Sequence, residues 1–281
     1  LFILFGALLE KTGIGQFFID ICNSIAGGAS GGPAKVAVLT SALLGTVSGS
    51  SVSNTVGSGS FTIPMMKKLG YKSEFAGAVE AAASTGGQLM PPIMGAAAFL
   101  MAESLGLPYI TIVKAAVIPA ILYFTGIFIT VHLEAHKLGL KGLPREQLPK
   151  FLPLFLRKGY MLIPLVVIVT FLCMGKTAVY AAIMGIVSCL LIGLVTSFVD
   201  LAHGRKPTFG FNDLLEVMCS AARNIISVAI ACAMAGIIIG IVTLTGIGLK
   251  FGAGLISISH GIAFITLFLT MISSIILGMG A

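Results

Sequence analysis

Apolar runs long enough to cross a lipid bilayer constrain this chain more than any other feature. A spanning helix needs roughly 20 consecutive apolar residues. The sequence predicts spans at 108–134, 159–175, 178–198, 224–244 and 262–278, with the end of another at 1–9. Only 10% of the residues are charged, against about 25% in soluble proteins. We therefore expect an all-α integral membrane protein in the lipid bilayer. A soluble enzyme, a nucleic-acid-binding protein and a disordered chain are excluded.

Two polar, glycine-rich segments interrupt the apolar sequence. The first, 48–59, follows a short helix-like stretch at 33–47, and the second, 85–92, interrupts a later helix. Unpaired backbone groups cost several kcal/mol in lipid, so such segments must be buried in protein or line a wet cavity. We predict a re-entrant hairpin, with helices at 33–47 and 54–68, followed by a broken helix.

The distribution of Lys and Arg favours the hairpin over a single crossing. With a hairpin, 14 basic residues lie on one side of the membrane and 3 on the other, whereas a single crossing gives 12 against 5. Cytoplasmic loops carry the excess of basic residues. The basic loop at 136–158 is therefore predicted to be cytoplasmic in either case.

A short motif indicates an internal repeat. Thr12-Gly13-Ile14-Gly15 recurs as Thr245-Gly246-Ile247-Gly248, and the segment 39–50 aligns with 269–280. The predicted topology places an odd number of crossings between the two copies, so the copies are inverted. Inverted repeats with broken helices are a recurring plan of secondary transporters.

We expect four regions along the chain. They are the end of a membrane helix plus an interfacial amphipathic helix (1–25), a transport core of hairpin and broken helix (26–107), membrane helices with the basic loop (108–222), and a second repeat truncated at its hairpin tip (223–281). The truncation leads us to expect a fragment of a longer polypeptide.

The segments GTVSGSSVSNTVGSGSFTIPMMKKLGY (45–71) and EFAGAVEAAASTGGQLMPPIMGAAAFLMAE (74–103) carry a resemblance to a known family. They resemble the large membrane subunit of tripartite ATP-independent periplasmic (TRAP) transporters, in the branch that works with TAXI-type binding proteins. The resemblance implies an elevator-type symporter for small organic acids in the bacterial inner membrane. It also implies a periplasmic TAXI-type substrate-binding protein and a small membrane subunit, often fused to the large one.

The polar tip and the helix break offer oxygen ligands for a coupling ion. Broken helices leave free carbonyl groups, and Ser, Thr and Asn add side-chain oxygens, which suit Na⁺. The candidate ion- and substrate-binding residues are Ser48, Ser50, Ser51, Asn54, Thr55, Glu80, Ser84, Thr85, Gly86, Gly87, Gln88, Pro91, Pro92, Gly278 and Gly280. Among them, the expected Na⁺ ligands are Ser50, Ser51, Asn54 and Thr85. The alternative is that these hydroxyls satisfy their own backbone.

Glu80 is a carboxyl group predicted to lie at membrane depth, where ionisable residues are costly and usually functional. It could bind a cation or carry a proton, so H⁺ is the alternative coupling ion. It could instead pair with Lys72 or a backbone group. We expect no covalent cofactor.

Two other classes of protein compete with a secondary transporter. Glu80-Ala81-Ala82 and Gly86 match the EAA-x-x-x-G signature of permeases in ATP-driven importers, and a channel could use the same hairpins. No sequence motif for catalysis supports an enzyme, so no catalytic residue is predicted.

Overall fold

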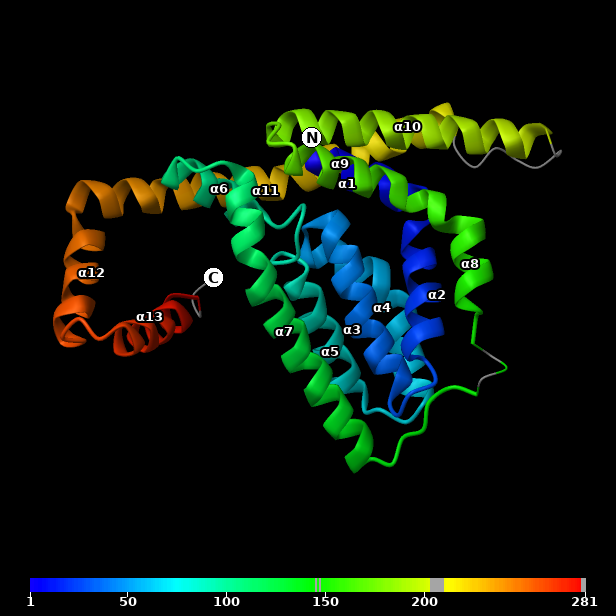
Figure 1. Ribbon diagram of the computed structural model, residues 1–281, viewed down its shortest axis with the longest axis horizontal. Coiled ribbons are helices and arrows are strands. Elements are labelled where there is room, and N and C mark those ends of the chain that lie inside the picture. The colour runs from blue at the N-terminus through cyan, green and yellow to red at the C-terminus, as the bar shows by residue number, and fades with distance from the viewer. Residues whose placement is uncertain (145, 147, 203–209, 279–281) are drawn as a thin grey trace. The chain divides into compact units, whose positions relative to one another are not determined.

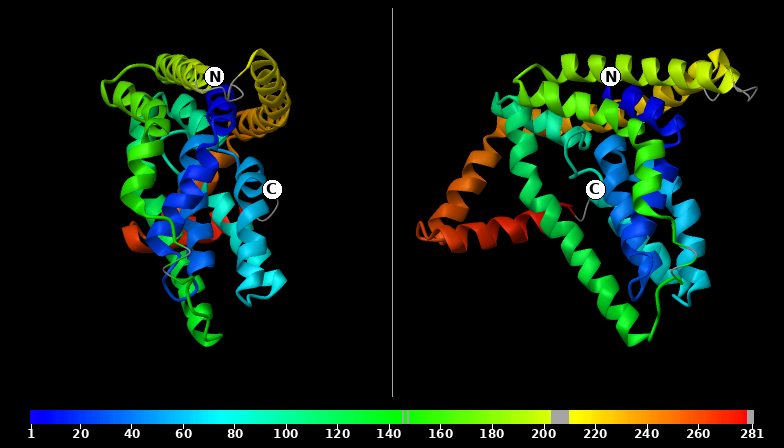
Figure 2. Two further views of the ribbon diagram at one scale, coloured as in Figure 1. Left: turned by 90° about the vertical axis from the view of Figure 1, so that its right-hand side faces the viewer. Right: turned by 45° about the vertical axis from the view of Figure 1, so that its right-hand side comes forward.

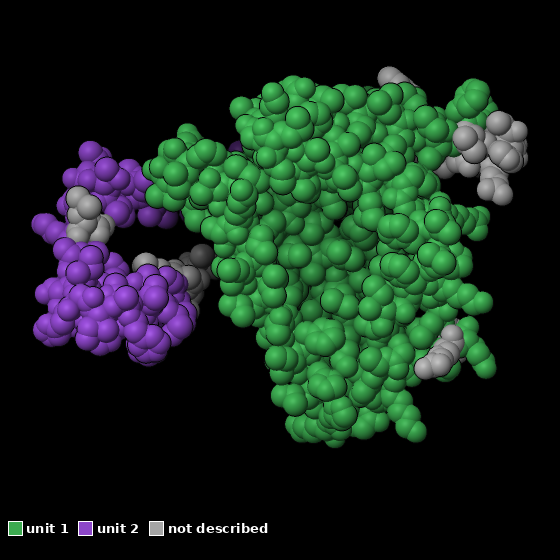
Figure 3. Space-filling view, in the orientation of Figure 1, with its two compact units in different colours: residues 1–226 green, residues 227–281 purple. Residues whose placement is uncertain are grey.

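The computed structural model describes residues 1–144, 146, 148–202 and 210–278, and all regular elements in these ranges are helical. The chain divides into two compact units, Leu1–Ile226 and Ser227–Ala281 (Figure 3). Gly280 and the basic residues Arg145, Arg205 and Lys206 lie outside the described residues.

Three helices form the centre of the first unit. Helices α3 (Gly32–Ser48), α4 (Ser51–Lys68) and α5 (Ser73–Gly86) pack against one another, and α2 (Ile14–Ala26) and α7 (Tyr109–Lys137) flank them (Figures 1 and 2). Only two residues join α3 to α4, so these helices form the predicted hairpin.

Local sequence explains where the hairpin arms begin and end. Gly31, at φ 67°, precedes α3, and Pro33 lies in its first turn, where proline is tolerated. Gly49 ends α3 in the left-handed conformation, at φ 59°. Such residues are typical of helix ends because glycine has no Cβ to clash. The tip of the hairpin is therefore set by glycine chemistry.

The predicted start of the second arm at residue 54 is wrong. Helix α4 begins at Ser51, so most of the polar segment 48–59 is helical. The reason is a helix cap. The Ser50 side chain accepts a hydrogen bond from the Ser53 backbone N–H at 3.3 Å, which satisfies a free donor of the first turn.

The predicted broken helix is confirmed. Helix α5 ends at Gly86, and α6 (Ala96–Leu105) begins after Gly95. The segment between them contains the Pro91–Pro92 pair, which is joined by a cis peptide bond. A proline supplies no backbone N–H, so this pair cannot continue a helical ladder.

The first residues form a bent helix pair. Helices α1 (Phe2–Lys11) and α2 meet at 70°, and Gly13 at the bend has φ 85°. Together they are apolar and long enough to be one broken span. Helix α2 matches the predicted amphipathic helix, and most of its apolar side chains, including Phe17 and Phe18, are buried in the first unit, whereas Ile25 is exposed. Its interfacial position stays a prediction.

The remaining long helices match the predicted spans in place, and the run Ala178–Phe198 also has the predicted bounds. Four helical runs in the described residues are long and apolar enough to cross a membrane, namely Tyr109–Lys137, Phe151–Cys173, Ala178–Phe198 and Asn212–Thr245. The second run combines α8 (Phe151–Lys158), η2 (Gly159–Leu162) and α9 (Ile163–Cys173), and the third lies in α10 (Ala178–Ala202). The predicted span at 224–244 begins earlier, because α11 covers Phe211–Thr245.

The second unit repeats landmarks of the first. Gly246, at φ 64°, separates α11 from α12 (Ile247–Ile258), as Gly13 separates α1 from α2. Helix α13 (Ala263–Gly278) follows α12, as α3 follows α2. Each copy of the TGIG motif therefore lies at a helix break, followed by a short helix and then a longer one. As described, α13 has 16 residues and is shorter than the span predicted at 262–278.

Candidate functional site

The hairpin tip and the helix break lie against each other. The Gln88 side chain donates a hydrogen bond from Nε2 to Ser51 Oγ at 2.9 Å. Gly49 packs on the break from the other end of the tip, where a Cβ would clash with the backbone of Met94. The hairpin tip and the helix break are therefore in contact, whereas the predicted pairing of Ser50, Ser51 and Asn54 with carbonyls of 85–88 around Na⁺ stays a prediction.

Glycines permit this close approach. The backbones of Gly45 in α3 and Gly87 in the break are so near that a Cβ on Gly87 would lie 3.0 Å from the Gly45 Cα. A Cβ on Gly87 would also lie 2.7 Å from Asn54 Nδ2. Only glycine allows backbones to approach so closely without displacing a neighbour.

The break itself is held by hydrogen bonds that do not belong to a helix. The Gly95 N–H donates to Gln88 O at 2.8 Å, which closes the irregular segment. Tyr109 Oη lies 2.9 Å from Pro92 O and 2.6 Å from Ile93 O. Tyr109 begins α7, so α7 fixes the far end of the break.

A buried carboxyl group lies at the centre of the three-helix core. Glu80 has no solvent exposure, and four side-chain hydroxyls surround its carboxyl oxygens. Ser41 and Ser84 are at 3.2 and 3.1 Å from Oε1, Ser58 also donates to Oε1, and Thr62 donates to Oε2. We call Glu80 and these four residues the Glu80 cluster. It joins α3, α4 and α5.

No cation neutralises Glu80 within the described part of the chain. The four ion pairs found there do not include Glu80, so the alternative of a partner in Lys72 is not supported. Burying a carboxylate is costly unless it is paired or hydrogen-bonded. Here hydroxyl groups take the place of a counter-ion.

Full burial of Glu80 also bears on the alternative that the chain is a permease of an ATP-driven importer. In such permeases the EAA-x-x-x-G signature belongs in a cytoplasmic loop that docks an ATPase. In this chain Glu80 lies inside α5 and Gly86 ends that helix. A docking protein could not reach the Glu80 side chain in this arrangement.

Asn54 connects the hairpin to both neighbours. It is 1% exposed, and its Nδ2 donates to Ser41 O at 2.8 Å while lying beside Gly87. The acceptor at Ser41 fixes the orientation of the amide, since only the NH₂ group can donate. Its Oδ1 is buried and has no hydrogen-bond partner among the residues that the structure describes.

The other predicted residues have local hydrogen bonds. Ser84 belongs to the Glu80 cluster, and Ser48 Oγ accepts from the Ser50 N–H at 3.4 Å. Thr55 and Thr85 donate to the carbonyls of Ser51 and Ala81, each at 2.8 Å, in their own helices. These two hydroxyls satisfy their own backbone, although each keeps lone pairs that could bind a cation.

Gly278 lies at the end of α13 in the second unit, and Gly280 falls outside the described residues. The pairing of residues 278–280 with the first hairpin therefore stays a prediction.

Sequence reasoning missed three members of the Glu80 cluster, namely Ser41, Ser58 and Thr62. A signal for two of them exists in the sequence. Asn54, Ser58 and Thr62 recur every four residues, which places them on one face of a helix. All three are buried in the structure.

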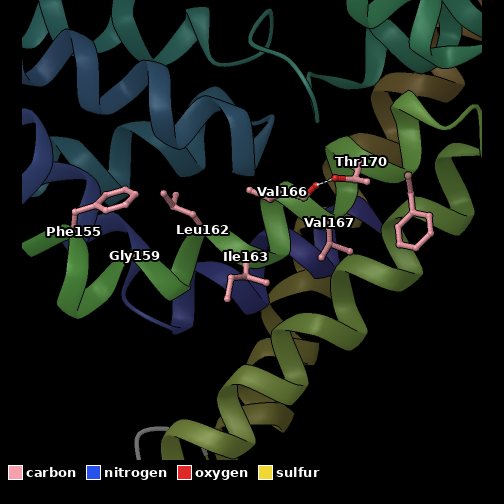
Figure 4. Close-up of a pocket in the computed structure, with 8 residues that line it drawn as sticks. Phe155, Gly159, Leu162, Ile163, Val166, Val167 and Thr170 are labelled. Atoms are coloured by element: carbon pink, nitrogen blue, oxygen red, sulfur yellow. Dashed lines mark hydrogen bonds between the residues drawn. The ribbon is translucent and has the colours of Figure 1, made fainter.

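A cavity in the first unit has the wrong chemistry for an ion or an organic acid. It measures about 370 Å³ and is lined by Phe155, Gly159, Leu162, Ile163, Val166, Val167, Thr170 and Phe171 (Figure 4). All of these belong to the single run α8–η2–α9. The only side-chain hydroxyl among them, that of Thr170, donates to Val166 O at 2.8 Å. The candidate site is therefore the hairpin, the break and the Glu80 cluster.

Comparisons with known proteins give a consistent result. A sequence profile described as "Tripartite ATP-independent periplasmic transporter, DctM component" matches residues 1–281. The chain is 31% identical over 153 residues to the C4-dicarboxylate TRAP transporter large permease protein DctM of Pseudomonas aeruginosa, a match covering 54% of this chain and 35% of the relative. It is 26% identical over 198 residues to the sialic acid TRAP transporter large permease protein SiaM of Vibrio cholerae, covering 69% and 45%. The chain thus spans less than half the length of these relatives.

Proposed function

The chain belongs to the DctM component family of tripartite ATP-independent periplasmic transporters, and from this premise we propose that it carries part of the binding core of a secondary transporter. The transporter would use an ion gradient to move small organic acids across the bacterial inner membrane. The observation that carries the proposal is the contact between the hairpin tip and the helix break, together with the fully buried carboxyl group of Glu80.

The ends of the broken helices suit an anionic substrate. Helices α4 and α6 begin at the tip and at the break, after Ser50 and Gly95. The first turn of a helix presents free N–H groups and a positive dipole end, which favour carboxylates. Two relatives are named as transporters of C4-dicarboxylates and of sialic acid, which are carboxylic acids. Their names support the organic-acid class for this chain.

The Glu80 cluster suits a coupling proton. With Glu80 ionised, the four hydroxyls can all donate to it. With Glu80 protonated, Ser58 and Thr62 can turn to the carbonyls of Asn54 and Ser58, which lie at 2.8 and 3.0 Å from their oxygens. Rotation of the hydroxyl groups is therefore enough to keep them hydrogen-bonded in both charge states of Glu80. We propose Glu80 as the site for H⁺.

Na⁺ is the second coupling ion that we propose, at the tip and the break. Its ligands would come from Ser50, Ser51, Asn54 and Thr85, together with carbonyl oxygens of 85–88. Support comes from the Ser51–Gln88 hydrogen bond, and from Asn54 Oδ1, which is buried and lacks a hydrogen-bond partner among the described residues. A cation there would bind backbone carbonyl oxygens that the helix break leaves without an acceptor role in a regular helix.

The energy of coupling requires more than one charge. One positive charge moving inward gains about 2.3 kcal/mol per 100 mV. A 100-fold accumulation of solute costs roughly 2.7 kcal/mol. One ion is therefore marginal and two suffice, before any ion gradient or substrate charge is counted.

We further propose the partners and the mechanism of the whole protein. A periplasmic TAXI-type binding protein would deliver the substrate, and a small membrane subunit, fused or separate, would complete the permease. The two segments that begin at the TGIG motifs would be inverted repeats of an elevator-type transporter. The matching breaks at Gly13 and Gly246 support the repeat.

Reconstitution tests the proposal. The complete transporter is placed in liposomes with its binding protein, and Na⁺ and pH gradients are imposed separately. We expect uphill uptake that needs the binding protein, and Glu80→Gln should abolish the component driven by the pH gradient. Glu74→Gln is the control, because Glu74 is an exposed carboxyl group on the same helix.

Two results would contradict this proposal. Uptake that only dissipates a solute gradient would indicate a channel. Unchanged pH-driven uptake in Glu80→Gln would exclude Glu80 as the proton site.

A further inference from the structure

Lys35 is a buried cation that lies outside the candidate site. It is near the start of α3 and is 5% exposed. The four ion pairs found in the described residues do not include it. Burial of an ammonium group is costly unless other groups accept its hydrogen bonds. The surroundings of Lys35 must therefore supply an acceptor.

The acceptor is a histidine of α7. Lys35 Nζ lies 3.0 Å from His132 Nδ1. An ammonium group can only donate, so Nδ1 accepts and the ring hydrogen of neutral His132 is on Nε2. The ammonium group also lies 5.5 Å from the centre of the Phe128 ring, one turn earlier in α7. This distance is within the range of a cation–π contact.

Small residues bring the two helices together at this contact. Val131 and Ala135 of α7 have no solvent exposure and belong to the same apolar cluster as Ala34 of α3. A Cβ on Gly31, which precedes α3, would clash with the Ala135 Cβ. Tyr71, between α4 and α5, donates from Oη to Gly31 O at 3.4 Å. The start of α3 therefore packs directly on α7, next to the polar contact.

No carboxylate pairs with His132 in the described part of the chain. His136 follows one turn later on α7, and the two imidazole rings meet edge-on with their centres 4.6 Å apart. Glu134, on the same helix, lies 3.6 Å from Lys137. Helices α5 and α6 also pack on α7, and their described residues place no ionisable side chain in hydrogen-bond or ion-pair contact with His132. The charge nearest to His132 is therefore that of Lys35.

The spacing of His132 and His136 would also suit a metal ion, because residues four apart share one face of a helix. However, Lys35 already occupies the Nδ1 atom of His132. No third ligand from His, Cys, Asp or Glu completes a metal site among the residues that the structure describes. The geometry favours a proton over a metal ion as the ligand of His132.

The contact between Lys35 and His132 tolerates only one positive charge. Lys35 already holds three hydrogens, so a further proton can add only to Nδ1 of His132. Both nitrogens would then be donors, the hydrogen bond would be lost, and two positive charges would face each other. An unperturbed imidazole titrates at about pH 6.5. Acidification of the cytoplasm is therefore the change to which this contact would respond.

We propose that Lys35 and His132 form an acid-sensitive latch between the hairpin and α7. The latch is closed while His132 is neutral, and it opens when Nδ1 takes up a proton from the cytoplasm. His132 is half-buried, and α7 ends five residues later at Lys137. The loop that follows is the one predicted to be cytoplasmic, so protons would arrive from that side.

Opening of the latch would act on the proposed binding core through both helices. Helix α3 carries Gly45, which packs on the break at Gly87. Helix α7 carries Tyr109, whose hydroxyl lies close to two carbonyl oxygens of the break. Loss of the latch would let these two supports of the break move apart. The inference rests on the proposed function, because a transporter that brings protons into the cell would slow down as the cytoplasm turns acidic.

Spin labels test the latch without any transport. In the complete purified transporter, the native cysteines are replaced and nitroxides are attached to Ala29→Cys and Leu133→Cys, which are exposed positions just before α3 and on α7. We expect the dipolar broadening seen at about pH 7.5 to weaken at about pH 5.5, on the two sides of the imidazole titration. His132→Gln should keep the broadening at both pH values, because its amide oxygen still accepts from Lys35 but takes up no proton.

His136→Gln is the matched control, because His136 neighbours His132 but has no hydrogen bond to Lys35. It should lose the broadening in acid as the unmodified protein does. Lys35→Met keeps the test decisive if His132→Gln fails to fold. It removes the second charge, so its spectrum should be the same at both pH values. An equal acid response in His132→Gln or in Lys35→Met, or a spectrum of the unmodified protein that does not change with pH, would overturn the inference.

Uptake assays separate the latch from the proposed function. The pH is kept equal on both sides of the liposome membrane, and a Na⁺ gradient and a membrane potential drive uptake. We expect initial rates to fall about tenfold per pH unit below the titration of His132, as the neutral fraction of the imidazole does, and to fall less in His132→Gln. If the labels responded to acid but no gradient-driven uptake occurred, the latch would stand and the proposed function would fall. If uptake showed the same acid response in both proteins, the proposed function would stand and the latch would fall.

Discussion

At the scale of single residues, Glu80 determines the chemistry of the core. It is buried in a cluster of hydroxyls drawn from three helices, and no positive charge is paired with it among the described residues. A buried acid of this kind is poorly suited to a purely structural role, because an apolar side chain would fill the space without a desolvation cost. This is the reason for proposing Glu80 as a site for a proton or a cation.

Thr62→Val tests the bond between this hydroxyl and Glu80. Valine is similar in shape but cannot donate, so the substitution should lower the free energy of unfolding by about 1.5–3 kcal/mol, the range for a hydrogen bond to a charged group. The loss should be smaller in a Glu80→Gln background, because neighbours that interact are not additive. Denaturant titration of the purified protein measures both.

Thr130→Val is the matched control. Thr130 is exposed, and its hydroxyl donates only to Gly126 O in its own helix. Equal losses of unfolding free energy in the two valine variants would contradict a special role for Thr62.

At the scale of elements, the helix break is positioned by glycine contacts between backbones. Gly45→Ala should therefore lower both stability and uptake, because the added methyl group would clash with the Gly87 backbone. Gly77→Ala in α5 should be neutral or slightly stabilising, since nothing lies within 4 Å of its Cβ position and alanine favours helix by about 0.5–1 kcal/mol.

Thermal unfolding and uptake assays on the two alanine variants check this prediction. Similar behaviour of the two variants would show that α3 does not need to approach the break.

The elements also show how far sequence reasoning reaches. The break after α5 could be predicted, because glycine and proline stop helices by local chemistry. The start of α4 could not be placed, because a single cap at Ser50 extends the helix through a segment whose composition resembles a loop. The prediction of an irregular tip at 48–59 also missed Ser58. This residue can be recognised as a member of the Glu80 cluster only when the segment is read as a helix with a buried face.

Glu10 shows a second limit. It lies far from the tip in sequence, and only tertiary packing brings it to Ser53. No local pattern around residue 10 indicates this contact.

At the scale of the whole molecule, the chain combines a helical hairpin and a broken helix with a second bent helix pair. Both copies of the TGIG motif mark a helix break with a glycine at positive φ. The chain spans less than half the length of its named relatives, and we propose that transport requires the complete assembly. The central claim is that the hairpin tip lines the path of substrate and ions in that assembly.

Labelling of Ser51→Cys tests this claim most directly. The variant is made in the complete transporter after replacement of the native cysteines, and a membrane-impermeant maleimide is applied from each side. We predict that the introduced thiol is labelled from at least one side and that substrate and coupling ion protect it, because Ser51 contacts the break at Gln88. A thiol that stays unlabelled from both sides under every ion and substrate condition would contradict the account.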